Sequence, residues 1–224
     1  MNKEFDYIVI GAGIAGCCLA YFLSKYSKSI LLIDRNSQVA FGASGAAGAF
    51  LSPLLGKPND FKDLVTKSLI FSTNFYKNLG EELVSNCGVC RIPKNEEDRD
   101  KFESYKPYMD FKYTQMDDGY FFFIFSQVTP SLICEKLTKD IEKKLSYNVI
   151  KLEQNENSTW IINDEICAKN IILTTGADVK HIKEDYFDIR GVWGQKIDVS
   201  TTTETKINYH KECSVSKASK IEGS

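Results

Sequence analysis

The beginning of the chain combines an apolar strand, a glycine turn, a helix and a second apolar strand that ends at an acid. The first strand is predicted at 6–10, the turn is 11–16, and the helix runs from Ile14 to about Tyr26. The second strand is predicted at 29–33 and is followed directly by Asp34. A G-x-G-x-x-G pattern alone is weak, but here every neighbouring element has the order of the dinucleotide-binding βαβ unit. The N-terminal segment therefore predicts a dinucleotide-binding α/β fold.

Each position of this motif has a physical task. Gly11 permits the tight turn, Gly13 lets the backbone approach a pyrophosphate, and Gly16 lets the helix pack closely on the sheet. The free N–H groups at the helix start, next to Ala12, Ile14 and Ala15, favour phosphate binding. Asp34 lies 18 residues after Gly16 (34 − 16), close to the spacing expected for an acid that binds ribose hydroxyls. This acid argues against a 2′-phosphate and leaves both NAD and FAD open.

Composition places the chain among ordinary globular proteins. Its 224 residues are 43% hydrophobic and 26% charged, with a net charge of −2, which gives no electrostatic footprint for nucleic acid or an anionic membrane. The longest apolar run, 120–125, predicts a strand buried on both faces and is too short to span a bilayer. No signal peptide precedes the first strand, and the number of cysteines, seven, is odd. Both observations predict reduced thiols and a cytoplasmic location, and we expect no membrane partner.

Cysteine and histidine patterns do not predict a metal site. The Cys87 and Cys90 spacing matches a redox motif, but it lacks the strand-to-helix setting that lowers a thiol pKa, so we interpret it as coincidence. His181 and His210 form no metal-ligand pattern with the cysteines. No catalytic side chain is assigned, and packing is the expected role of Tyr120 and Trp193.

The remaining chain predicts a mixture of helices and strands. The segment 41–49 is rich in Gly and Ala, which suits close backbone approach to a ligand. Helices are predicted at 60–83 and, with Thr129 as N-cap and Pro130 in the first turn, at 130–141. The charged segment 94–100 is expected to be a solvated face. Strands are predicted at 149–152 and 159–162 as an antiparallel pair, at 169–174 before a small-residue turn, and within 207–215.

These pieces together resemble the D-amino-acid-oxidase-like superfamily of FAD-dependent oxidoreductases. The opening βαβ unit matches, 42–48 falls where that family wraps the FAD, and 171–177 resembles its late strand-plus-turn motif. At 191–195 the family often has Arg-Gly-Gln, and Trp193 replaces the arginine. The resemblance implies an α/β protein with a Rossmann-like FAD-binding domain (1–84 plus 128–186). The resemblance also implies a second, smaller α+β substrate domain (85–127 plus 187–224), which is incomplete.

The resemblance implies FAD as cofactor, because three segments, 11–16, 42–48 and 174–177, converge on one ligand. The implied cofactor-binding residues combine the glycine turn, the acid and its neighbour, the small-residue loop, one backbone contact to adenine and the late turn. They are Gly11, Ala12, Gly13, Ile14, Ala15, Gly16, Asp34, Arg35, Ser44, Gly45, Ala46, Ala47, Gly48, Val149, Thr175, Gly176 and Ala177.

Within the superfamily, 42–56 is most similar to the oxidoreductase part of tRNA 5-methylaminomethyl-2-thiouridine biosynthesis bifunctional proteins. This similarity implies oxidation of a secondary amine, the carboxymethylaminomethyl group of a tRNA wobble uridine. Two alternatives stay open: a glycine- or sarcosine-type amino-acid oxidase, which would favour a carboxylate-binding arginine (Arg91 or Arg190), and a catalytically incomplete FAD-binding remnant. Because superfamily members continue further, a complementing C-terminal segment or second chain is an expected partner, besides a small-molecule amine or modified tRNA.

Overall fold

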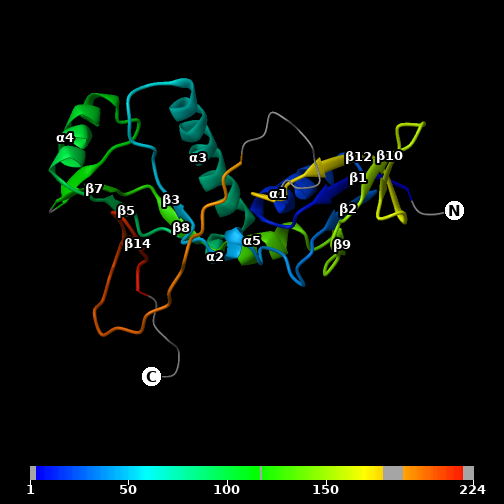
Figure 1. Ribbon diagram of the computed structural model, residues 1–224. Coiled ribbons are helices and arrows are strands. Elements are labelled where there is room, and N and C mark those ends of the chain that lie inside the picture. The colour runs from blue at the N-terminus through cyan, green and yellow to red at the C-terminus, as the bar shows by residue number, and fades with distance from the viewer. Residues whose placement is uncertain (1–3, 117, 179–188, 219–224) are drawn as a thin grey trace. The chain divides into compact units, whose positions relative to one another are not determined.

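The computed structural model describes residues 4–116, 118–178 and 189–218, which divide into two compact units (Figure 1). The first unit contains 4–47 together with 130–178 and 189–196. The second unit contains the intervening residues from Gly48 to Thr129 and the segment 197–218. By this division 48–84, which we assigned to the FAD-binding domain from the sequence, lie in the second unit.

The first unit is built on a six-stranded sheet in which the central strands are parallel. The strand order is β10-β11-β12-β1-β2-β9, with β12, β1, β2 and β9 parallel and β10 and β11 antiparallel. The apolar runs in β1 and β2 supply the β-branched and aliphatic residues that a sheet buried on both faces requires. The strands are β1 (Glu4–Ile10), β2 (Ile30–Ile33), β9 (Glu142–Lys144), β10 (Leu152–Gln154), β11 (Trp160–Ile162) and β12 (Ile166–Leu173).

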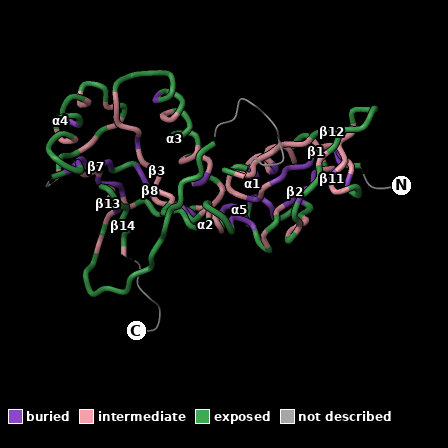
Figure 2. The backbone as a smooth tube through the Cα atoms, viewed as in Figure 1, coloured by how far each residue is buried: buried purple, intermediate pink, exposed green. Residues whose placement is uncertain are grey.

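Apolar residues cover both faces of this sheet, and the buried stretches follow β1 and β2 in Figure 2. On one face α1 (Ile14–Leu23) and α5 (Pro130–Leu137) contribute Cys17, Ala20 and Cys134 to the core. On the other face the β10–β11 hairpin contributes residues such as Ile162. A short helix, α2 (Ala43–Ala46), follows in the loop after β2. The predicted dinucleotide-binding architecture and mixed α/β fold class are confirmed.

Parallel pairing brings three distant turns to one edge of the sheet. β1 pairs with β2 up to Ile10 opposite Ile33, and with β12 up to Ile10 opposite Leu173. The residues that follow these strands, Gly11, Asp34 and Thr174, therefore lie together at the carboxyl edge. This edge is where ligands bind in open α/β sheets.

The second unit has two sheets, ordered β14-β13-β5-β7-β6 and β3-β8-β4. Its core is mainly aromatic, with Phe102, Tyr120, Phe122 and Phe125 packed around Leu69. The strands are β3 (Phe50–Leu51), β4 (Val84–Ser85), β5 (Val89–Arg91), β6 (Thr114–Met116), β7 (Gly119–Phe122), β8 (Ser126–Val128), β13 (Asn208–His210) and β14 (Ser214–Val215). The helices are α3 (Asp60–Leu79), α4 (Glu96–Tyr105) and the 3₁₀ turns η1 (Glu81–Leu83) and η2 (Lys106–Tyr108).

Two sequence predictions about this unit and its flanks are wrong, and a third, about the charged segment, is confirmed in part. The predicted strand at 120–125 ends at Phe122, and Phe123 and Ile124 form an exposed turn (79% and 54% exposed) that lets the chain return as β8. The charged segment 94–100 is mainly exposed, as predicted, and part of it forms α4, which the Asn95 side chain caps by accepting from the Asp98 N–H at 2.9 Å. Trp193 is 98% exposed and is not a packing residue.

The late antiparallel pair is confirmed with a shifted boundary. β10 covers Leu152–Gln154 where we predicted 149–152, and it pairs with β11 as expected. β12 confirms the predicted strand before the small-residue turn, and β13 and β14 confirm strands within 207–215.

Candidate cofactor-binding site

The glycine turn after β1 is held by the backbone of the protein itself. Gly11 has φ +109°, a conformation that favours glycine, and its N–H donates to the Ile33 carbonyl at 2.8 Å. A Cβ on Gly11 would overlap the Thr174 carbonyl, and a Cβ on Gly16 would overlap the Gly11 carbonyl and lie 2.6 Å from the Thr174 Oγ1. Both glycines are therefore required by packing between β1, α1 and β12.

Gly13 differs from these two glycines because a Cβ built there would meet one side-chain atom and no backbone atom. A Cβ there would meet only the Ser44 Oγ, at 3.2 Å. Gly13 is the N-cap of α1 and provides no side-chain cap, so the first N–H groups of the helix need another acceptor. Ser44 provides one, since its Oγ accepts from the Ile14 N–H at 3.0 Å. This contact brings the 42–48 loop to the helix terminus where a phosphate is expected.

Asp34 is bonded within the protein more extensively than the sequence predicted. One carboxylate oxygen accepts from the Ala12 N–H at 2.6 Å, and the other accepts from the N–H and the Nδ2 of Asn36 at 2.8 and 2.9 Å. A carboxylate has about four lone-pair sites, so these three bonds leave capacity for a ribose hydroxyl. Asn36 was missed, although an acid followed two residues later by Asn is a turn signal.

The small-residue loop is exposed and contains little side-chain mass. Gly45 packs so closely on the Ala40 carbonyl that a Cβ would overlap it, while Ala46, Ala47 and Gly48 are exposed. Ala47 ends the first unit and Gly48 begins the second. The predicted residues Ser44 to Ala47 thus lie in the first unit with the glycine turn.

The late turn also approaches the glycine turn, through a residue that sequence reasoning did not single out. The Thr174 Oγ1 donates to the carbonyls of Ile10 and Gly11, at 3.0 and 2.8 Å. Thr175 is half-buried, whereas Gly176 (φ +66°) and Ala177 are exposed. The hydroxyl of Thr174 therefore ties β12 to the turn that carries Gly11.

Two residues that we predicted to bind the cofactor, Arg35 and Val149, use their side chains for contacts within the protein. Arg35 forms an ion pair with Asp178 at 2.7 Å, which joins the ends of β2 and β12. Val149 is 5% exposed and belongs to the apolar cluster under the β10–β11 hairpin, with Ile162 and Ile166. A contact of Val149 to a ligand would have to use its backbone, as the resemblance implies.

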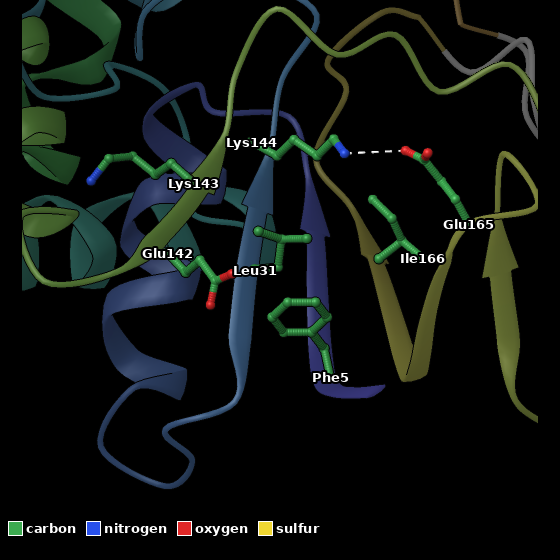
Figure 3. A pocket seen from close by; sticks show the side chains of 7 residues that line it. All are labelled: Phe5, Leu31, Glu142, Lys143, Lys144, Glu165 and Ile166. Carbon is green, nitrogen blue, oxygen red and sulfur yellow. Dashed lines mark hydrogen bonds and ion pairs between the residues drawn. The ribbon is translucent and has the colours of Figure 1, made fainter. Parts of the chain in front are cut away.

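A hollow of about 410 Å³ lies on the face of the first unit's sheet to which Phe5, Leu31 and Ile166 contribute (Figure 3). Its apolar floor contains Phe5, Leu31 and Ile166, and an ion pair of 3.1 Å joins Lys144 and Glu165 at its rim. None of the predicted cofactor-binding residues lines this hollow, so we place the candidate cofactor-binding site at the carboxyl edge of the sheet.

The buried cysteines beneath the glycine turn are packing residues. Cys17 donates to the Ala12 carbonyl at 3.4 Å and is fully buried. A hydrogen bond with Cys134, together with burial, raises the pKa of Cys17, which keeps it a protonated thiol.

Among the described residues no group of three His, Cys, Asp or Glu side chains could hold a metal ion. Within the same residues no helix is long and apolar enough to cross a membrane.

A family comparison agrees with this geometry. The model of the family "FAD dependent oxidoreductase" matches residues 6–217. The chain belongs to this family. FAD is its cofactor. The turn at Gly13, beside the α1 terminus, has no backbone atom near the position of a Cβ and so leaves room for the pyrophosphate of FAD, while the Ile14 N–H there donates to the Ser44 Oγ.

Individual relatives are more distant. The tRNA 5-methylaminomethyl-2-thiouridine biosynthesis bifunctional protein of Campylobacter fetus subsp. fetus is 23% identical over 159 residues, which cover 69% of this chain and 26% of that protein. Glycine oxidase of Bacillus subtilis is 33% identical over 91 residues, which cover 40% of this chain and 23% of that protein. The aligned regions thus span about a quarter of these relatives.

Solved structures share the fold. The crystal structure of glycine oxidase from Geobacillus kaustophilus has a TM-score of 0.67 at 14% identity, and the match covers 81% of this chain and 57% of that chain. L-α-glycerophosphate oxidase from Mycoplasma pneumoniae, with FAD bound, has a TM-score of 0.65 at 18% identity, with 78% and 55% covered. The Rossmann-like arrangement is therefore that of FAD-binding oxidases.

Proposed function

We propose that this chain carries the FAD-dependent part of an oxidoreductase that oxidises the C–N bond of a secondary amine. The observation that supports it most directly is the cradle in which Ser44 caps the Ile14 N–H beside the open position at Gly13. Bound FAD would supply the hydride acceptor for this reaction. The residues of the chain bind and orient the cofactor, and Asp34 adds an acceptor for a ribose hydroxyl.

The proposed substrate is the carboxymethylaminomethyl group of a tRNA wobble uridine. The similarity of 42–56 to the tRNA 5-methylaminomethyl-2-thiouridine biosynthesis bifunctional proteins supports this choice, as does the 69% of the chain aligned with the Campylobacter fetus protein. The second candidate is a small amino acid such as glycine or sarcosine. It is supported by the higher local identity, 33%, to glycine oxidase of Bacillus subtilis.

Single-turnover reduction of the flavin tests these candidates. Purified chain is reconstituted with FAD, mixed anaerobically with tRNA bearing the carboxymethylaminomethyl group, and followed through the visible absorbance of oxidised flavin. We expect bleaching with this tRNA and none with tRNA lacking the group. Bleaching with glycine or sarcosine and not with tRNA would support the second candidate. FAD binding without bleaching by any amine would contradict both.

We further propose that a complementing C-terminal segment or second chain completes the substrate side. The support is that the matched solved chains are covered only to 57% and 55%. Supplying the corresponding C-terminal region of a relative, in cis or as a separate chain, should raise both FAD affinity and the rate of flavin reduction. Equal rates with and without that region would contradict this proposal.

A further inference from the structure

The segment 189–201 is exposed along its whole length although it contains large apolar side chains (Figure 2). It forms neither helix nor strand, and the chain passes along it from the first unit, which ends at Lys196, into the second. The exposed fractions of Val192, Trp193, Ile197 and Val199 are 87%, 98%, 77% and 75%. Apolar side chains that gather in solvent in this way mark an interaction surface.

Side-chain character alternates along this segment with the period of a β-strand. The odd positions include Trp193, Ile197 and Val199, which are aromatic or β-branched, and the even positions between them include Lys196 and Asp198. Aromatic and β-branched residues are enriched in strands. Because successive side chains of a strand point to opposite faces, an extended segment would have one apolar face and one charged face.

The backbone groups on one edge of this segment are available for strand pairing. Among the described residues, no backbone hydrogen bond is formed by Trp193, Gln195, Ile197 or Val199. In an extended chain the N–H and C=O groups of such alternate residues point to the same side and form one edge. An open edge that carries apolar side chains is a template for pairing with another chain.

The charges on this segment favour a second copy of the same segment as the partner. Antiparallel pairing about Ile197 places Lys196 opposite the second copy's Asp198, and the two-fold symmetry repeats this pair. Opposite charges directly across two strands are favourable, and side chains are closest in the pairs that are not hydrogen-bonded. Parallel pairing in register would instead place Lys196 beside Lys196, which is unfavourable.

We propose that 193–201 is an interaction surface for a second copy of this chain, joined by antiparallel strand pairing about Ile197. The ladder would use the backbone of Ile197 at the two-fold axis, with Gln195 opposite Val199 and Trp193 opposite Thr201 on either side. The apolar side chains of both copies then share one face of the ribbon. Because a two-stranded ribbon alone is marginally stable, the dimer is weak and its population depends on protein concentration.

Sedimentation equilibrium of the full chain, from about 1 μM to about 1 mM protein, tests the surface in the range of weak interfaces. We expect the mean mass to rise with concentration toward that of two chains. Ile197→Glu places two carboxylates opposite each other at the axis and should weaken association by about tenfold or more. The matched control Val192→Glu, at an equally exposed apolar position outside the paired residues, should leave association unchanged.

A charge exchange tests the register of the pairing. Lys196→Asp should weaken association by about threefold or more, because it places like charges opposite each other at two symmetric positions. The double variant Lys196→Asp with Asp198→Lys should restore association, since opposite charges face each other again. Urea denaturation of each variant separates an effect on pairing from an effect on folding, and we expect equal free energies of unfolding for the wild type and the double variant.

Three results would overturn the proposal. The first is a chain that stays monomeric over the whole concentration range, and the second is a dimer that survives Ile197→Glu. The third is a double variant that folds normally and does not regain association. A monomeric chain whose amides in 193–201 become protected from hydrogen exchange only when the C-terminal region of a relative is supplied would assign the surface to that region.

Discussion

The two units depend on different parts of the polypeptide. In the first unit the glycine turn depends on backbone, namely the N–H groups at the start of α1 beside Gly13 and the close packing at Gly11 and Gly16. In the second unit the core is built mainly of aromatic side chains, among them Phe102, Tyr120 and Phe122. A region built of backbone is lost when atoms are added, and one built of a side chain is lost when atoms are removed. Within the first unit, substitutions that add atoms therefore test the glycine turn, and truncations test the side chains around it.

Gly16→Val should have the largest effect. Its Cβ would overlap the Gly11 carbonyl and approach the Thr174 Oγ1, so α1 could not pack on the sheet. We expect the free energy of unfolding to fall by about 3 kcal/mol or more, with loss of FAD binding, as measured by urea denaturation and visible absorbance. Gly42→Ala is the control, since no atom lies within 4 Å of its Cβ. A fully stable Gly16→Val chain would contradict the close packing.

Gly13→Val should abolish FAD binding while the fold survives. The Cβ meets only the Ser44 Oγ in the protein, and the side chain would occupy the space expected for the pyrophosphate. Denaturation should show a change in the free energy of unfolding of no more than about 1 kcal/mol. If this variant retained flavin in an absorbance titration, the assignment of the cradle would be wrong.

Asp34→Ala should weaken FAD binding without abolishing it. Each charge-assisted hydrogen bond is worth about 1.5–3 kcal/mol, which corresponds to a roughly 10- to 100-fold loss of affinity in a titration of apo-protein. Because Asp34 also accepts from Ala12 and Asn36, some stability should be lost as well. Asn36→Ala serves as the control, since it removes an internal bond and keeps the carboxylate. Equal FAD affinity in wild type and Asp34→Ala would refute the ribose contact.

Val149→Ala should affect stability and leave FAD affinity unchanged. The side chain is 5% exposed in the apolar cluster, and its truncation removes two buried methyl groups, about 2 kcal/mol in the free energy of unfolding. Val215→Ala, at a position that is 48% exposed, is the matched control and should cost little. A clear loss of FAD affinity in Val149→Ala would mean that the side chain, and not the backbone, meets the ligand.

The first unit could be predicted largely because local and long-range signals coincide there. The run before Gly11, the helix after it and the acid at Asp34 each have a sequence signature, and their parallel pairing follows from the βαβ connection. What the sequence did not reveal are bonds between distant segments. Ser44 on the Ile14 N–H and Thr174 on the Gly11 carbonyl depend on three-dimensional packing and on no periodic pattern.

The second unit was predicted less well for physical reasons that can be named. Its strands are short, so hydrophobic alternation has few residues in which to appear, and the aromatic run misled because Phe123 and Ile124 form an exposed turn. The helix α4 was missed because its interior is charged, although Asn95 and the acidic first turn are helix-start signals. Burial of Arg91 has no sequence signature, since it depends on how β13 and the Pro53 loop enclose β5.

The pairing of β1 with β12 has a consequence for how the chain acquires its structure. Tyr7 pairs with Asn170, so one neighbour of the first strand emerges from the ribosome 163 residues later (170 − 7). Contacts of such high sequence separation slow folding. Until β12 is synthesised, one edge of β1 stays open to pairing with other chains, a hazard for a nascent polypeptide. Chaperone binding during translation should therefore last until residues of β12 have left the exit tunnel.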